Sequence, residues 1–360
     1  MFDPGMLGTL VGPELGTGVR VLGIDIGGAN IKAATSDGDC ATIPFAMWLT
    51  PDELADSLVA LAERLGSVSA WAVTMTGEMA DAYYDRAVGV RRIAGQTRMA
   101  ADRAMVSDIA FYGVDGRFRE LDEVLEFPDP CASANWHALA HWLAGQIDSP
   151  ALLIDVGSTT TDIIPIRPGM VATESRTDFD RLLAGELVYL GGGRTPVCSL
   201  IDTAPYRGHR VPVMREVFAT TDDCALVLGW TAEDPADRMT SDSMPRTEAA
   251  AVNRLARMIG LDHRGLDVDD ARGIAREVMD AAAVKISDSI GRQSAEFLSH
   301  RILSGHTADY FLPPADSVPS AIRIDRLADL VGDGLSRVSP AFACACLRSR
   351  ELGRRGVARR

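Results

Sequence analysis

The sequence predicts a two-lobed, duplicated α/β protein with a ligand cleft between the lobes, and three observations support this. A length of 360 residues suggests two domains. An apolar strand ends in an Asp-x-Gly turn twice, at Asp25 and again 130 residues later at Asp155. Each turn is polar and leads into a second apolar strand. The predicted parts are a loose extension at 1–18, lobes at 19–148 and 149–345, and a basic tail at 346–360.

The first lobe begins with residues typical of buried strands. Residues 19–26 and 31–35 predict a β-hairpin whose connection carries Gly27 and Gly28. Leucines spaced three or four apart predict an amphipathic helix at 51–65, which starts with a proline and stops at Gly66. The expected elements that follow are a strand at 70–75, a turn at Asp115-Gly116 and a helix at 134–146.

The second lobe repeats the opening pattern and then becomes more helical. An apolar strand at 151–156 runs into the Asp155 turn and a second strand at 163–166. Helical periodicity predicts helices at 180–188, 247–259 and 268–290, and an apolar run predicts a short strand at 225–229.

Composition excludes several classes of protein. A formal net charge of −14 argues against a broad nucleic-acid-binding surface. No run of 18 or more apolar residues is present, so we expect no membrane span. The first residues lack the basic and apolar regions of a secretory signal, so we expect a cytoplasmic protein. The sequence leaves the oligomeric state open, including a homo-oligomer.

The two Asp-x-Gly turns predict a site for a phosphate or diphosphate. Glycines let a backbone approach the ligand and present N–H groups to it. A carboxylate repels phosphate, so Asp25 and Asp155 are expected to act through Mg²⁺ or a similar divalent ion. The remaining candidate phosphate-binding residues are Gly27, Gly28 and Asn30 in the first turn and Gly157, Ser158, Thr159 and Thr160 in the second.

Four charged residues near these turns are candidates for catalysis. Lys32 is one of only two lysines in the chain and follows Asp25 by seven residues. Glu78 lies just beyond a predicted strand end, where open α/β sheets place ligands, and Asp162 follows the hydroxyl cluster of the second turn. Arg194 ends a run of three glycines, and its guanidinium suits a phosphate. The alternative for each is a structural strand or loop residue.

The ordered motifs resemble a known family. They are Gly23–Lys32 (GIDIGGANIK), Thr74–Glu78 (TMTGE), Ser133–Trp136 (SANW), Ile154–Ile164 (IDVGSTTTDII) and Arg194–Val197 (RTPV). Together they resemble the hydantoinase A/oxoprolinase-like branch of the actin, sugar-kinase and chaperone-ATPase superfamily. Within it they look like the tetrahydromethanopterin-linked C1-transfer pathway proteins, whose archaeal relatives are methanofuran-biosynthesis condensing enzymes.

The resemblance implies the duplicated actin and ribonuclease H-like ATPase fold and an ether-forming transferase. In that family an aminomethyl-furanmethanol diphosphate loses pyrophosphate to the phenol oxygen of a tyramine- or tyrosine-type acceptor, so small-molecule diphosphate and phenolic amine substrates are implied. From residue chemistry we expect Lys32 or Arg194 to offset the leaving-group charge and Glu78 or Asp162 to take the phenolic proton. Which acid serves as the base stays open.

Two other functions remain open at this stage. The first is an ATP-dependent small-molecule kinase or a hydantoinase-like hydrolase of the same fold. The stretch 303–309 stands where kinase-like relatives carry a glycine-rich adenosine motif, yet it has one glycine, which disfavours ATP. The second alternative is a non-catalytic nucleotide- or metabolite-binding scaffold. The three acids Asp25, Asp155 and Asp162 disfavour it, because a mere binder does not need them together.

Overall fold

The computed structural model describes residues 19–312 and 319–358, so the predicted extension at 1–18 lies outside it. The chain forms two compact units that interleave in sequence. The first unit takes its residues from Met1–Leu152, Ile164–Arg181 and Asp325–Arg360, and the second from Leu153–Ile163 and Leu182–Ile324. The predicted lobes were contiguous ranges, whereas these units exchange segments.

A six-stranded mixed sheet forms the core of the first unit, in the order β3-β2-β1-β4-β5-β6. Its strands are β1 (Val21–Ile26), β2 (Asn30–Thr35), β3 (Cys40–Pro44), β4 (Ala70–Met75), β5 (Asp108–Tyr112) and β6 (Phe118–Arg119). The β1–β2 and β2–β3 pairs are antiparallel, and β4 and β5 continue from β1 in parallel. The predicted hairpin and the strand at 70–75 are therefore confirmed.

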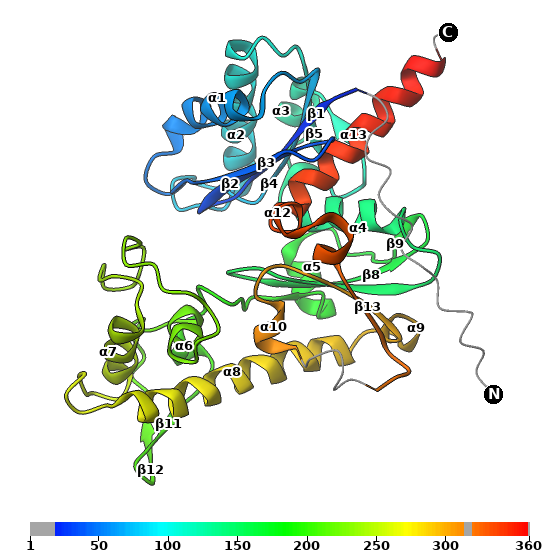
Figure 1. Cartoon of the computed structure of the whole chain (residues 1–360). Helices are drawn as coiled ribbons and strands as arrows, with labels where there is room; N and C mark the ends of the chain where they lie inside the picture. The colour runs from blue at the N-terminus through cyan, green and yellow to red at the C-terminus, as the bar shows by residue number, and fades with distance from the viewer. Residues whose placement is uncertain (1–18, 313–318, 359–360) are drawn as a thin grey trace. The chain divides into compact units, whose positions relative to one another are not determined.

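Helices cover both faces of this sheet (Figure 1). Alternate β1 residues Leu22, Ile24 and Ile26 enter a core shared with α1 (Leu54–Leu65) and α2 (Arg86–Arg103). The other face packs against α13 (Ser339–Ala358), which in turn contacts α4 (Asn135–Ala144). A side chain at Gly23 would place its Cβ 1.8 Å from the carbonyl oxygen of Ala341, so only glycine allows α13 to lie this close.

Substituting Gly23 by alanine is expected to destabilise the protein. The new Cβ would collide with backbone atoms of α13, which cannot rotate away, and overpacking of this kind costs about 2–3 kcal/mol. Chemical denaturation checks the free energy of unfolding. The matched control is Gly95→Ala in α2, where nothing lies within 4 Å of the new Cβ, and it should be neutral or stabilising. Equal stability of both variants would contradict this packing.

The second sheet has the order β10-β8-β7-β13-β14, with β9 also paired to β8. Its strands are β7 (Ala151–Val156), β8 (Thr161–Arg167), β9 (Met170–Val171), β10 (Leu187–Val188), β13 (His300–Ser304) and β14 (Arg323–Arg326). The turn between β7 and β8 is closed by the N–H of Gly157 donating to the carbonyl of Thr160, at 2.9 Å. The β1–β2 turn has the same bond, from Gly27 to Asn30 at 3.0 Å, which confirms the duplication locally.

The second unit carries a long helix, α8 (Val268–Gly291), shown in yellow in Figure 1. It packs against α6 (Thr221–Val227), α7 (Glu248–Met258), α10 (Ala308–Phe311) and the first strand of a hairpin, β11 (Thr203–Tyr206) and β12 (His209–Pro212). The predicted strand at 225–229 is wrong, because this apolar run belongs to α6. Thr220 and Asp223 form a capping box that starts the helix.

A buried ion pair joins α6 to α7. The Nε of Arg254 donates to Oδ1 of Asp223 at 2.7 Å, and both residues are almost fully buried. Arg254 also pairs with Asp242 at 3.1 Å. Removing one partner of such a pair would leave an uncompensated buried charge, so the pair fixes how these helices meet.

Short elements complete the described chain: η2 (Pro51–Glu53), α3 (Leu121–Glu126), η3 (Asp129–Cys131), α5 (Asp178–Ala184), η4 (Val197–Ser199), α9 (Ala295–Leu298), α11 (Leu327–Val331) and α12 (Asp333–Ser336). The helix expected at 180–188 ends at Ala184, before β10. The basic tail expected at 346–360 is instead helical through Ala358 as part of α13, in which Cys346 and Arg348 are buried. No helix in the described ranges is long and apolar enough to cross a membrane.

Candidate active site

The first predicted phosphate turn connects β1 to β2. Asp25 is 5% exposed at the end of β1 and lies opposite Lys32 on β2, so both side chains project from the same face of the sheet. Lys32 is half-buried and makes no hydrogen bond or ion pair within the described residues. Beside Gly28 a Cβ would meet nothing within 4 Å, which leaves space next to the backbone. The turn therefore combines an acid, a cation and an open glycine backbone.

The turn that carries Glu78 packs against this first turn. Thr74 on β4 is the register partner of Asp25. Two residues after β4, the N–H of Gly77 donates to the carbonyl of Ile26 at 3.0 Å. A Cβ on Gly77 would stand 3.0 Å from the carbonyl oxygen of Gly27, so glycine permits this close approach. The structure thus brings Asp25, Lys32 and the Glu78 turn to the same edge of one sheet.

Glu78 is completely buried, and its environment favours the protonated acid. Its Oε1 accepts a 2.8 Å hydrogen bond from the hydroxyl of Ser133, while Oε2 is buried with no hydrogen-bond partner in the described structure. Burial raises the pKa of Glu78 from 4.5 to about 7; the Ser133 hydrogen bond opposes the rise and the nearby Asp178 adds to it. A carboxyl of this kind exchanges a proton near neutral pH.

Ser133 connects Glu78 to a second carboxylate. Its hydroxyl lies 3.2 Å from Oδ2 of Asp178, and its backbone adopts the left-handed conformation, at φ 47°, which non-glycine residues rarely adopt. Arg181 pairs with Asp178 at 3.2 Å and places its guanidinium over the Trp136 ring, 4.4 Å from the centroid. Strained residues of this type gather at functional sites.

The sequence did not assign this group a role. In the sequence, Ser133 and Trp136 stand out only as part of one motif, and Asp178 lies before the helix predicted at 180–188. The contact between Ser133 and Asp178 spans 45 residues of sequence, and no periodicity reveals it. The Asp178–Arg181 pair, three residues apart, was the one local signal available.

The second predicted phosphate turn is enclosed by a glycine-rich loop. The N–H groups of Gly193 and Arg194 donate to the carbonyl of Ser158 at 3.0 and 2.8 Å, and the N–H of Gly192 donates to that of Gly157 at 3.0 Å. This places the exposed Arg194 at the edge of the turn. Half-buried hydroxyls here make no hydrogen bonds within the described chain and are available to a ligand. They belong to Ser158, Thr159 and Thr160.

Residues 303–309, which stand where kinase-like relatives carry the adenosine motif, also pack on this turn. A Cβ on Gly305, which has a φ of 83°, would lie 2.1 Å from the carbonyl oxygen of Val156. The hydroxyl of Thr307 donates to the carbonyls of Val156 and Gly157, at 3.1 and 3.2 Å. The single glycine in this segment is therefore required for packing against β7.

The predicted residues divide between the two units. Asp25, Gly27, Gly28, Asn30, Lys32 and Glu78 belong to the first, and Asp155, Gly157, Ser158, Thr159, Thr160, Asp162 and Arg194 belong to the second. Asp162 is 9% exposed on β8, next to β10. Whether the two turns face one another across a cleft, and whether Asp25 and Asp155 share one ion, stay predictions.

The oxygen donors at the two turns fit Mg²⁺ chemically. Within the described residues, no group of three or more His, Cys, Asp and Glu side chains is arranged to hold a metal ion. Mg²⁺ usually binds through one or two carboxylates and takes its other oxygens from water and substrate phosphates, so a dedicated cluster is not required. Asp25 and Asp155 are the next-to-last residues of β1 and β7, and the Mg²⁺ assignment is therefore a proposal based on donor chemistry.

The sheets and turns define the class of protein, and comparison with known proteins defines the family. In both sheets a hairpin carries an Asp-x-Gly turn, and this is the α/β fold class of actin and the sugar kinases, as predicted. The structure of a nucleotide-free acetone carboxylase is similar in fold. The match covers 91% of this chain and 70% of the carboxylase chain, with a TM-score of 0.52 and 11% sequence identity. The family model for hydantoinase/oxoprolinase matches residues 70–297, so the chain belongs to the hydantoinase/oxoprolinase family.

Two named relatives are synthases. The chain is 30% identical to the (4-{4-[2-(gamma-L-glutamylamino)ethyl]phenoxymethyl}furan-2-yl)methanamine synthase of Methanocaldococcus jannaschii, over 93% of this chain and 99% of the relative. It is 28% identical to the Methanococcus vannielii protein of the same name, over 59% of this chain and 97% of that relative. These matches confirm the resemblance stated from the motifs, and they place the chain in a family of enzymes.

Proposed function

We propose that this protein is a transferase that joins the furanmethyl carbon of an aminomethyl-furanmethanol diphosphate to the phenol oxygen of a tyramine- or tyrosine-type acceptor, in methanofuran-type cofactor biosynthesis. One observation carries the proposal: the chain matches 99% of the length of a synthase whose name describes a phenoxymethyl-furan methanamine. That name contains the aryl ether which this reaction would form. A γ-glutamylated tyramine is the acceptor that the relative's name suggests.

The reaction balances without ATP. The phenol oxygen forms a bond to the furanmethyl carbon, the bond from that carbon to the diphosphate oxygen breaks, and pyrophosphate leaves with the electron pair. A furanmethyl carbon carries positive charge by resonance, so the protein needs mainly to hold the diphosphate, position the phenol and exclude water. The open backbone at Gly28 and the available hydroxyls of Ser158, Thr159 and Thr160 are suited to holding it.

Two cationic side chains are placed to offset the negative charge of the departing diphosphate. Lys32 lies opposite Asp25 and has no protein partner in the described residues. The backbone of Arg194 is bonded to the second turn, so its side chain extends from the edge of that turn. Mg²⁺ bound through Asp25 and Asp155 would neutralise further charge on the diphosphate. Hydrogen-bond donors and cations that are fixed before the reaction favour a departing polyanion.

The phenolic proton is proposed to reach Glu78 through Ser133. Glu78 is fully buried, so direct contact with a substrate, as the sequence suggested, would require the surrounding turn to move. Ser133 is half-buried and donates to Glu78, so its hydroxyl can accept the proton of the phenol as it passes its own to the carboxylate. A base with a pKa of about 7 suits proton transfer near neutral pH. Asp162 remains the alternative base.

Lys32→Ala is expected to test the cation's role. Loss of the ammonium should lower kcat by roughly 100-fold, because the charge on the leaving group grows during the reaction, and should change the KM for the phenol little. Steady-state kinetics with each substrate varied measure the two constants. The matched control is Lys285→Ala on α8, the chain's only other lysine. A rise in phenol KM with unchanged kcat would assign Lys32 to acceptor binding instead.

A further inference from the structure

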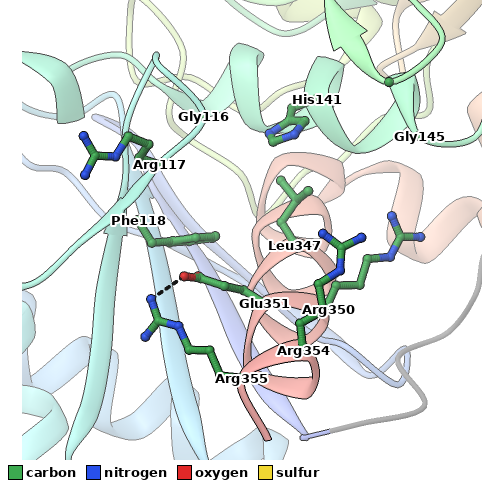
Figure 2. Close-up of a pocket in the computed structure, with 11 residues that line it drawn as sticks. Gly116, Arg117, Phe118, His141, Gly145, Leu347, Arg350, Glu351, Arg354 and Arg355 are labelled. Carbon is green, nitrogen blue, oxygen red and sulfur yellow. Dashed lines mark hydrogen bonds and ion pairs between the residues drawn. The ribbon is translucent and has the colours of Figure 1, made fainter. Parts of the chain in front are cut away.

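A pocket in the first unit is lined by cations that the proposed reaction does not use. It has a volume of about 640 Å³ and lies among the β5–β6 connection, the end of α4 and the last turns of α13. Figure 2 shows Arg117 on the hairpin side and Arg350 and Arg354 on the helix side, with His141 above them. All of its lining residues belong to the first unit.

Three of the four arginines that line this pocket have no carboxylate partner in the described residues. Within the described chain, no carboxylate pairs with the side chains of Arg117, Arg350 or Arg354. The one carboxylate in the lining, Glu351, is already bound by Arg355 at 2.6 Å and by Arg348, from outside the lining, at 2.8 Å. The Nε of Arg350 is buried and makes no hydrogen bond. Gathered cations repel one another, and a buried donor without a partner costs free energy, so an anion in the pocket would relieve both.

The neighbouring histidines add acceptors and donors but no negative charge. The hydroxyl of Tyr112 lies 2.9 Å from Nδ1 of His137 and 2.8 Å from Nδ1 of His141. Burial lowers the pKa of His137 to about 3, and burial followed by the charge of Arg350 lowers that of His141. Both rings are therefore neutral at neutral pH, and His141 is one of the residues that line the pocket. In a chain of net charge −14, this concentration of cations is local.

We propose that this pocket binds a small oxyanion with two or more negative charges, carried on phosphate or carboxylate groups. Guanidinium groups bind both by paired hydrogen bonds, and Phe118 and Leu347 supply an apolar wall beside them. The volume is that of an ordinary small-molecule site. The site is separate from the Asp25 turn, because its residues come from the β5–β6 hairpin, the end of α4, the β8–β9 turn and α13, and not from the β1–β2 connection.

The test uses pyrophosphate and citrate as probes of the two anion classes. Isothermal titration calorimetry with chelator present measures binding of each to the full-length protein and to Arg350→Gln, Arg354→Gln and the double variant. Each substitution removes a charged donor, so we expect roughly 10-fold weaker binding per substitution. The probe that binds more tightly identifies phosphate or carboxylate as the preferred class. Arg92→Gln on α2 removes an exposed arginine that is outside the pocket lining and is the matched control.

Two further results decide the proposal. The part of the binding that the arginine variants lose should be equally large in the Asp25→Asn background, because Asp25 belongs to the predicted reaction site and not to this pocket. Because Arg354 is exposed, its variant reports on binding even if Arg350→Gln fails to fold. The proposal is overturned if neither anion binds at millimolar concentration, or if the arginine variants bind as tightly as the unaltered protein. Loss of binding in Asp25→Asn but not in the arginine variants would also overturn it.

Discussion

Glu78→Gln is expected to lower kcat by roughly 10²- to 10⁴-fold, the usual contribution of a general base. Glutamine keeps the size of the side chain and can still bond to Ser133, but it cannot accept the proton. In the unaltered protein, kcat/KM should rise with pH and level off above about 7, as Glu78 loses its proton. Asp81→Asn, an exposed carboxylate three residues further on, is the matched control and should keep full activity.

Ser133→Ala should reproduce most of this loss if the proton passes through the hydroxyl. The double variant with Glu78→Gln should then be little slower than either single variant, because one proton path is lost in each case. Pre-steady-state rates of ether formation measure the coupling. Independent, multiplicative effects would show that Ser133 only orients the site, and an active Glu78→Gln would transfer the role of base to Asp162.

Glu78→Gln, which lowers activity, is expected to make the protein more stable than the unaltered protein at high pH. The folded-state pKa of Glu78, about 7, exceeds the ordinary value of 4.5, so the folded protein binds the extra proton between these pH values. The stability contributed by that proton is present below 4.5 and is lost as the pH rises through about 7. Linkage converts the shift to about 3 kcal/mol. Between pH 4.5 and about pH 8, the free energy of unfolding of the unaltered protein should therefore fall by about 3 kcal/mol relative to that of Glu78→Gln. Parallel pH profiles for the two proteins would contradict the raised pKa.

The second large effect is expected from the two turn aspartates. Asp25→Asn and Asp155→Asn should each lower Mg²⁺-dependent activity by roughly a thousandfold, because each removes a negative ligand while keeping the side-chain shape. Both variants should fold normally, since asparagine is nearly isosteric. Activity measured against Mg²⁺ concentration, with Asp52→Asn as an exposed control, makes the comparison. Full activity in either variant would remove that residue from the metal site.

The duplication and the strands around each turn could be predicted because the signals are local. Asp25 and Asp155 each follow an apolar run and precede glycine, and the hydrogen bonds from Gly27 and Gly157 close identical turns. The strand expected at 225–229 failed because the capping box at Thr220 begins a helix that buries the same apolar residues. Apolar runs this short do not separate a buried strand from a buried helix.

The surroundings of Glu78 were beyond sequence reasoning because they depend on long-range contacts. Its burial results from packing among β4, α2 and the segment near Ser133; Gly89 on α2 would place a Cβ 2.1 Å from the Glu78 carbonyl oxygen. The helix at the end of the chain was missed for a related reason. Its arginine-rich sequence suggests a solvated tail, whereas Arg348 is buried and pairs with Asp108, 240 residues earlier.

The most direct test of the central claim follows the oxygen that bridges the furanmethyl carbon and the diphosphate. The protein is incubated with a furanmethyl diphosphate labelled with heavy oxygen at that position and with a γ-glutamyl-tyramine acceptor, in Mg²⁺ and without ATP. Mass spectrometry then locates the label in the products. If the phenol attacks carbon, all of the label leaves in pyrophosphate and the ether contains the phenol's own oxygen. Label retained on a furan product would contradict the assignment, and so would ADP formation with no ether in a parallel incubation that contains ATP.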